Sequence, residues 1–186
     1  MRRAGFARVP LKWDDFDNLT VKFPEFVSRS AIAFHAFHSC RKHGCENLLD
    51  SSFGQPGVYG DGTDLCILTY GNGTYLSRQA EKELREQHNT QVRIVDIRWL
   101  VPLPEQEILQ AAASCKHILI VDEGRRSGSI SEALRTLLLE AGVTAPVTRL
   151  TGADSFIPLG DAARLVLPGK DEIIAAALQP GRSQAV

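Results

Sequence analysis

The chain has 186 residues, of which 44% are hydrophobic and 23% are charged, values typical of one soluble α/β domain with an extension and not of a disordered chain. Lys and Arg number 21 against 22 Asp and Glu, a formal charge of −1. We therefore expect neither a nucleic-acid binder nor a membrane binder, since both classes usually carry a basic excess. The sequence has no run of about 18 apolar residues and no apolar stretch behind its basic start, so we expect no transmembrane helix and no signal peptide. Four cysteines are too few for a disulfide scaffold, which favours reduced thiols and a cytoplasmic protein.

The first 56 residues show no sustained hydrophobic period, and turn-forming residues at 51–57 mark a boundary. We predict an irregular leading segment (1–56), a regular domain (57–180) and a frayed tail (181–186). The leading segment holds five groups that can bind a metal within eleven residues, which are His35, His38, Cys40, His43 and Cys45. Zinc needs about four ligands, usually with wider loops between pairs. We favour a His/Cys-rich surface segment and keep a zinc-bearing interaction segment as an alternative.

Strand-like and helix-like segments alternate from residue 57 onward. A short strand is expected at Val58–Tyr59, and longer, mostly apolar strands are expected at 65–70, 92–97, 117–122 and 147–150. Apolar residues at helical spacing predict helices at 75–84, 105–113, 129–141 and 171–178. This alternation is typical of βαβ units, so the predicted fold class is α/β, a three-layer α/β/α domain with a mostly parallel sheet.

The segment Gly71-Asn72-Gly73-Thr74 lies where a Rossmann phosphate loop would lie, after a strand and before a helix. The dinucleotide fingerprint requires a third Gly or Ala three residues after the second glycine, where this chain has Leu76. We therefore predict a plain strand-to-helix turn, capped near Asn72 to Thr74.

The most polar loop of the regular domain follows the predicted strand 117–122, at the edge where open α/β sheets place their sites. Its candidate residues for anion binding or for an interface are Glu123, Arg125, Arg126, Ser127, Gly128 and Ser129. Arginines beside glycines and a helix N-terminus suit a carboxylate or a phosphate. We favour ion pairs within a subunit interface, because such networks are common without a ligand. The predicted N-cap of the next helix is Ser129, and no Gly-x-Ser-x-Gly elbow or other nucleophile–base pattern predicts a catalytic residue.

Three segments in order, 64–73, 95–104 and 120–132, resemble the transketolase C-terminal domain, and 151–160 resembles the late segment of that domain. The likeness covers about 57–178 and is strongest to the beta subunit, or the fused beta half, of thiamine diphosphate-dependent 2-oxoacid dehydrogenases. It implies a sheet of about five strands with one antiparallel edge strand. It also implies membership of an enzyme that oxidatively decarboxylates pyruvate or a branched-chain 2-oxoacid.

In that family, thiamine diphosphate and magnesium are bound by other domains, while this domain stabilises a dimer and helps to dock a lipoyl acyltransferase. The resemblance therefore implies no cofactor and no catalytic residue in this chain, which would be inactive without the remaining domains or the alpha subunit. The leading segment departs from the family pattern, since His35 stands where an acid is usual, so we expect a remnant of a preceding domain or a divergent start. The alternative function is a free-standing α/β module that binds an anionic metabolite at the Glu123–Ser129 loop.

Overall fold

A computed structural model of the chain describes residues 54–185; the predicted metal cluster at 35–45 lies outside these residues. The described strands are β1 (Gly57–Tyr59), β2 (Leu65–Thr69), β3 (Val92–Asp96), β4 (His117–Arg125), β5 (Val147–Gly152) and β6 (Gln184–Ala185). The described helices are α3 (Asn72–His88), α4 (Glu105–Ala113), α5 (Ile130–Glu140), α6 (Lys170–Ala177) and the 3-10 helix η2 (Gly160–Leu165).

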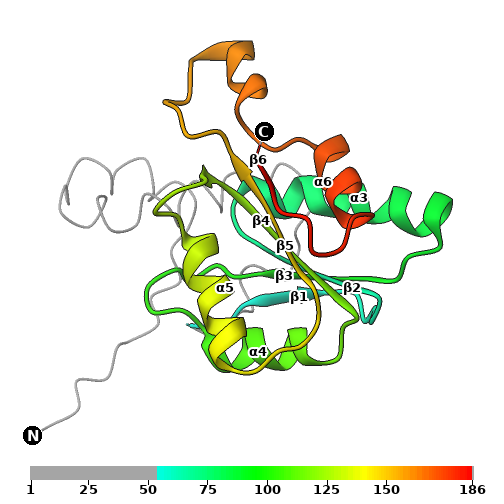
Figure 1. The fold of residues 1–186 in the computed structure, drawn as a ribbon. Helices are drawn as coiled ribbons and strands as arrows, with labels where there is room; N and C mark the ends of the chain where they lie inside the picture. Colours follow the sequence, from blue (N-terminus) through cyan, green and yellow to red (C-terminus); the bar gives the residue numbers. More distant parts are fainter. Residues whose placement is uncertain (1–53, 186) are drawn as a thin grey trace, which may run out of the picture. The chain divides into compact units, whose positions relative to one another are not determined.

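The strands form one sheet in the order β1-β3-β2-β4-β5-β6 (Figure 1). The edge strand β1 is antiparallel to β3, with Val58 opposite Val95, and every other pairing is parallel. The predicted three-layer α/β/α class with an antiparallel edge strand is confirmed.

Alternate residues of the central strands enter two separate cores, because successive side chains of a strand point to opposite faces. Leu65 and Ile67 of β2 pack with α3 and α6 on one face. Cys66 and Leu68 pack with α4 and α5 on the other face. This double burial explains why β2 reads as an unbroken apolar run in the sequence.

The structure differs from the sequence prediction mainly at element ends. Strand β4 continues three residues past Asp122, with an irregular register between Asp122 and Arg125, so Glu123 belongs to the strand and not to a loop. The tail predicted to fray contains β6, which pairs with β5. The Ser183 hydroxyl accepts a hydrogen bond from the Arg149 amide beside this pairing, a long-range contact that no local pattern reports.

Candidate functional site

The carboxyl ends of β2 and β4 lie at the point where the chain changes direction across the sheet. In the sheet, β3 lies on one side of β2 and β4 lies on the other side. Helix α3, which follows β2, and helix α5, which follows β4, pack on opposite faces of the sheet (Figure 1). Open α/β sheets bind ligands in the crevice that such a switch point creates. In this chain, the side chains of Tyr70 and Asp122 meet across it, so the crevice is bridged by the protein itself.

Asp122 is fully buried, and both of its carboxylate oxygens accept hydrogen bonds. Its Oδ1 accepts from the Tyr70 hydroxyl at 2.6 Å and from the Gly124 amide at 2.7 Å, and its Oδ2 accepts from the Ser131 amide at 2.9 Å. Burial acts to raise the pKa of this carboxyl, but the hydrogen bonds from Tyr70 and its other donors outweigh it and the pKa is lowered. Asp122 is therefore held as a carboxylate and is committed to the protein.

The same carboxylate provides the N-terminal cap of α5. Ser131 is the second residue of this helix, and its amide is one of the donors that a helix start leaves without an intrahelical partner. Ser129 is the N-cap residue of α5, as predicted, but its side chain makes no cap hydrogen bond. Its hydroxyl lies 2.7 Å from the Ser131 hydroxyl, and Asp122 accepts from the Ser131 amide in its place.

Arg149 on β5 joins the loop after β4 to the start of α5. Its Nη2 donates to the Ser131 hydroxyl at 2.9 Å and to the Arg126 carbonyl at 2.8 Å, and it lies 3.9 Å from a Glu132 carboxylate oxygen. Its side chain is only 14% exposed. Sequence reasoning placed Arg149 in a strand but missed this role, since the contact depends on β5 lying beside β4.

The backbone amides of the predicted anion loop are occupied by carboxylates of the same chain. The Ser127 amide and hydroxyl donate to the two carboxylate oxygens of Asp154 at 3.0 and 2.9 Å. The Gly128 amide donates to Glu132 at 3.0 Å. A phosphate or carboxylate ligand would have to displace these groups.

Arg125, the last residue of β4, and Arg126, the first residue after it, are exposed and lie within electrostatic range of Asp154. Hydrogen bonds from Ser127 lower the pKa of Asp154, and the positive charges of Arg126 and Arg125 act in the same direction. Of the six predicted residues, four lie in the loop after β4, while Glu123 and Arg125 belong to β4 itself, where Glu123 is half-buried and Arg125 is exposed. Sequence reasoning missed Asp154, which is 27 residues from Ser127 in the chain.

Amides of the turn at Gly71–Thr74 are likewise bonded to carbonyls of the same turn. Gly73 and Thr74 donate their amides to the carbonyls of Tyr70 and Gly71. A Cβ at Gly73 would collide with the Thr69 hydroxyl, so this glycine is required for close packing of α3 on β2. The helix begins at Asn72 without a side-chain cap, which corrects the predicted capping near Asn72 to Thr74.

The segment after β5 exposes large apolar side chains. Phe156 is 98% exposed, Leu159 is 96% exposed and Leu165 is 77% exposed. The backbone of this segment extends beyond the end of the sheet in the orange part of the ribbon (Figure 1). In the sequence this segment is a short apolar run interrupted by Pro158, with neither the period of a strand nor that of a helix. Such a run does not indicate whether its side chains are buried or exposed.

Residues 54–185 contain neither a cluster of metal ligands nor a membrane-spanning helix. No three His, Cys, Asp or Glu side chains in this part of the chain are arranged to hold a metal ion. Within the same residues, no helix combines the length and the apolar character that crossing a membrane requires.

The model of the family "Transketolase, C-terminal domain" matches residues 56–173. The chain is 28% identical over 141 residues to the pyruvate dehydrogenase E1 component subunit beta of Staphylococcus aureus, covering 74% of this chain and 43% of that protein. It is 34% identical over 140 residues to the 1-deoxy-D-xylulose-5-phosphate synthase of Albidiferax ferrireducens, covering 70% of this chain and 21% of that protein.

A similar fold occurs in the structure of a split-gene transketolase described as an inactive beta4 tetramer. The TM-score is 0.61 at 21% sequence identity, over 70% of this chain and 43% of that chain. The chain thus spans less than half the length of these two curated relatives and of this structure.

Proposed function

Because the chain belongs to the transketolase C-terminal domain family, we propose that 57–180 is the assembly and partner-docking domain of a thiamine diphosphate-dependent 2-oxoacid dehydrogenase. The full enzyme would oxidatively decarboxylate pyruvate or a branched-chain 2-oxoacid in the cytoplasm. The likeness to a pyruvate dehydrogenase beta subunit supports this class. The proposed partners are a second copy of the chain, the alpha subunit or the remaining domains, and a lipoyl acyltransferase.

The observation that carries the proposal is the exposed apolar segment between β5 and α6. Four of its side chains, Phe156, Ile157, Leu159 and Leu165, are between 58% and 98% exposed. Scattered apolar residues are normal on a protein surface, but a contiguous group marks an interaction site. Large aromatic and aliphatic side chains are also the usual anchors of a protein interface.

The two ends of this segment are bonded to each other, which fixes the position from which its apolar side chains extend. The Ala153 amide donates to the Val166 carbonyl at 3.0 Å and joins the two ends. Gly152 packs closely between β4 and the residue that follows η2, since a Cβ there would lie 3.0 Å from the Val166 carbonyl and 3.1 Å from the Glu123 carbonyl. A fixed base lowers the ordering entropy that binding must overcome.

Self-association of the full chain tests the proposal directly. Phe156→Ser with Leu159→Ser removes both anchors, and Leu139→Ser, which alters a 76% exposed leucine on α5, is the matched control. Burying one such side chain contributes about 1.5–3 kcal/mol, so the double variant should weaken the dimer at least about tenfold. Sedimentation velocity over a dilution series measures the change.

The same three proteins should be tested for binding to the alpha subunit and the lipoyl acyltransferase of the source organism. Loss of either contact in the double variant alone supports docking at this segment. A wild-type chain that stays monomeric and binds neither partner contradicts the proposal.

Thiamine diphosphate and magnesium are assigned in this proposal to the other domains, and the chain contributes no catalytic residue. Calorimetric titration of the purified chain with thiamine diphosphate and magnesium should show no binding. Stoichiometric binding, or turnover of a 2-oxoacid by the chain alone, would overturn the non-catalytic assignment.

The alternative function, an anion-binding module, is favoured by one observation: Arg125 and Arg126 are adjacent and both exposed where β4 ends. Against it stands Asp154, which already occupies the neighbouring amide and lies near both guanidinium charges. We therefore place it second.

A further inference from the structure

The exposed apolar segment is bonded, near its start, to a different part of the chain. Asp154 follows Ala153, and its two carboxylate oxygens accept hydrogen bonds from the Ser127 amide at 3.0 Å and the Ser127 hydroxyl at 2.9 Å. The Ser155 amide, by contrast, donates locally, to the Ala153 carbonyl at 2.8 Å. Asp154 therefore connects the segment to the loop after β4, two residues before Phe156.

The loop after β4 is itself held in place on both sides of Ser127. The Arg126 carbonyl accepts from the Nη2 of Arg149 on β5 at 2.8 Å. The Gly128 amide donates to the carboxylate of Glu132 on α5 at 3.0 Å. Because the loop is fixed to a strand and to a helix, a contact with it can fix the position of another segment.

Asp154 has the charge and the geometry that such a contact requires. The hydrogen bonds from Ser127 lower the pKa of its carboxyl, and the charges of Arg126 and Arg125 act in the same direction. The group is therefore a carboxylate at neutral pH, with both oxygens available as acceptors. Since the two Ser127 donors reach separate oxygens, the pair restricts the orientation of Asp154 as well as its distance from the loop.

We propose that Asp154 is the positioning residue of the exposed apolar segment, and that by binding Ser127 it holds Phe156 in the arrangement that docks a partner. The inference rests on the proposed function of this segment. The bond between Ala153 and Val166 closes the base of the segment, and the contact of Asp154 adds a further fixed point. Ordering a loop at an interface costs free energy, so a segment that is already positioned should bind more tightly.

Removal of the carboxylate in the full chain tests the proposal. In Asp154→Ala, chymotrypsin should cleave after Phe156 about three- to tenfold faster than in the wild type, because proteolysis follows the population of the open form. Self-association should weaken by a similar factor. Mass spectrometry at a concentration too low for association measures the cleavage, and sedimentation velocity measures the association.

The control is Asp161→Ala, which removes another carboxylate of the same segment. Asp161 is 97% exposed, and its partner Arg164 belongs to the same 3-10 helix. Cleavage and association of this variant should match the wild type. The urea midpoints of Asp154→Ala and Asp161→Ala should stay close to that of the wild type, since both side chains are exposed.

Variants of Ser127 separate this contact from a general loss of charge. Ser127→Ala removes one of the two donors and should change cleavage and association in the same direction as Asp154→Ala, by a smaller factor. Ser127→Thr keeps the hydroxyl and should match the wild type. Combined with Asp154→Ala, Ser127→Ala should have no added effect, because its partner is already gone.

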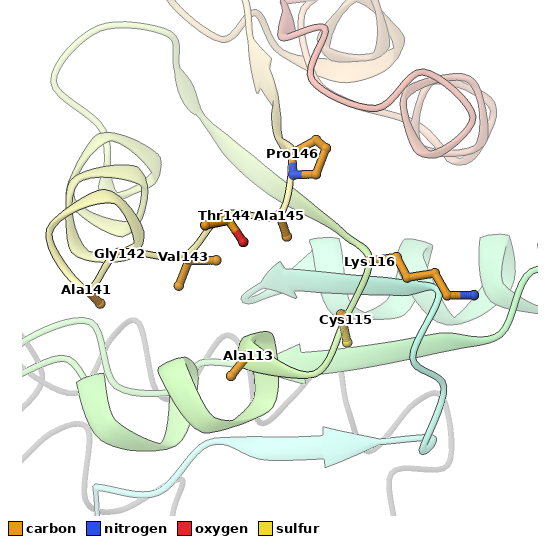
Figure 2. A pocket seen from close by; sticks show the side chains of 9 residues that line it. All are labelled: Ala113, Cys115, Lys116, Ala141, Gly142, Val143, Thr144, Ala145 and Pro146. Carbon is orange, nitrogen blue, oxygen red and sulfur yellow. The ribbon is translucent and has the colours of Figure 1, made fainter.

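The opposite end of the strands provides a control surface. Ala113, Lys116 and the turn 141–146 line an open depression of about 600 Å³ there (Figure 2). This depression lies before β4 and β5, whereas the exposed apolar segment follows β5. Thr144→Arg places a bulky charge at it and should change neither association nor cleavage after Phe156. Association weakened by Thr144→Arg but not by Asp154→Ala would overturn the proposal.

The proposal is also overturned if Asp154→Ala is cleaved and associates like the wild type, or if Asp161→Ala changes both as much. The same holds if Ser127→Ala has its full effect in the presence of Asp154→Ala. Failure of the docking function gives a different result. Phe156→Ser with Leu159→Ser then leaves association unchanged, while faster cleavage of Asp154→Ala still supports its positioning role.

Discussion

The phenol of Tyr70 donates a 2.6 Å hydrogen bond to Asp122 and so ties the carboxyl end of β2 to that of β4. Burial raises the pKa of Tyr70, and the hydrogen bond to Asp122 raises it further, so the phenol keeps its proton and remains a donor. This bond crosses the position where related architectures hold ligands. In this chain the position is therefore occupied by a hydrogen bond that connects two strands.

Tyr70→Phe should lower the free energy of unfolding by about 1–3 kcal/mol, because a buried carboxylate loses one of its donors. Urea denaturation measures the change. Asp122→Asn and the double variant complete a double-mutant cycle, since residues in contact show a coupling energy. A coupling energy within error of zero would show that the bond has no energetic role.

Stability should fall on mild acidification because of His117, whose Nε2 lies 2.9 Å from the Thr148 hydroxyl. Burial lowers the pKa of His117 below its ordinary value of 6.5, against a hydrogen bond with the Ala177 backbone. The unfolded chain therefore binds this proton more readily, so stability is complete above about pH 6.5 and is lost as pH falls toward the folded pKa.

Urea midpoints between about pH 8 and about pH 5 check this, with His117→Gln as the comparison. The variant should show a smaller loss of stability over the same range, whatever its stability at neutral pH. Equal slopes for the two proteins would contradict the assignment to His117.

Arg125→Ala with Arg126→Ala should leave the free energy of unfolding within about 0.5 kcal/mol of the wild-type value, because both side chains are exposed. Calorimetric titration with inorganic phosphate should show no saturable binding in either the wild type or the variant. Saturable binding by the wild type that disappears in a folded variant would instead favour the anion-binding alternative.

Gly73→Ala should destabilise the fold by about 1–3 kcal/mol, since the new methyl group collides with the Thr69 hydroxyl. Thr69→Ala removes that hydroxyl, which is buried and has no hydrogen-bond partner among residues 54–185. The double variant should therefore be more stable than the sum of the two single changes predicts, by thermal or urea unfolding. Strict additivity would show that close packing is not the reason for the glycine.

Several features of the fold could be predicted because they depend on local pattern. The run 65–70 is apolar on both faces, which is what a strand between two helical layers requires. The order of segments around 64–73, 95–104 and 120–132 then indicated the family that the comparison confirms. Element ends were less certain, as the extension of β4 to Arg125 shows.

The candidate site was only half predictable. Its polar segment, from Glu123 to Ser129, was visible in the sequence as a change from apolar to polar residues. Its partners were not, because Asp154 and Arg149 reach that loop from 27 and 23 residues away. The loop would be an anion site if its amides were free, but they donate to carboxylates of the same chain. The position of Asp154 depends on the path of the chain after β5.

By itself, the sequence determined the layers of this domain, because hydrophobic period and turn chemistry act between neighbours along the chain. Only the tertiary structure decided the contacts that bear on function. It joins Tyr70 to Asp122 and leaves Phe156 in solvent. The reason is that long-range contacts are set by strand order and helix packing, and residues 52 positions apart carry no local sign that they meet.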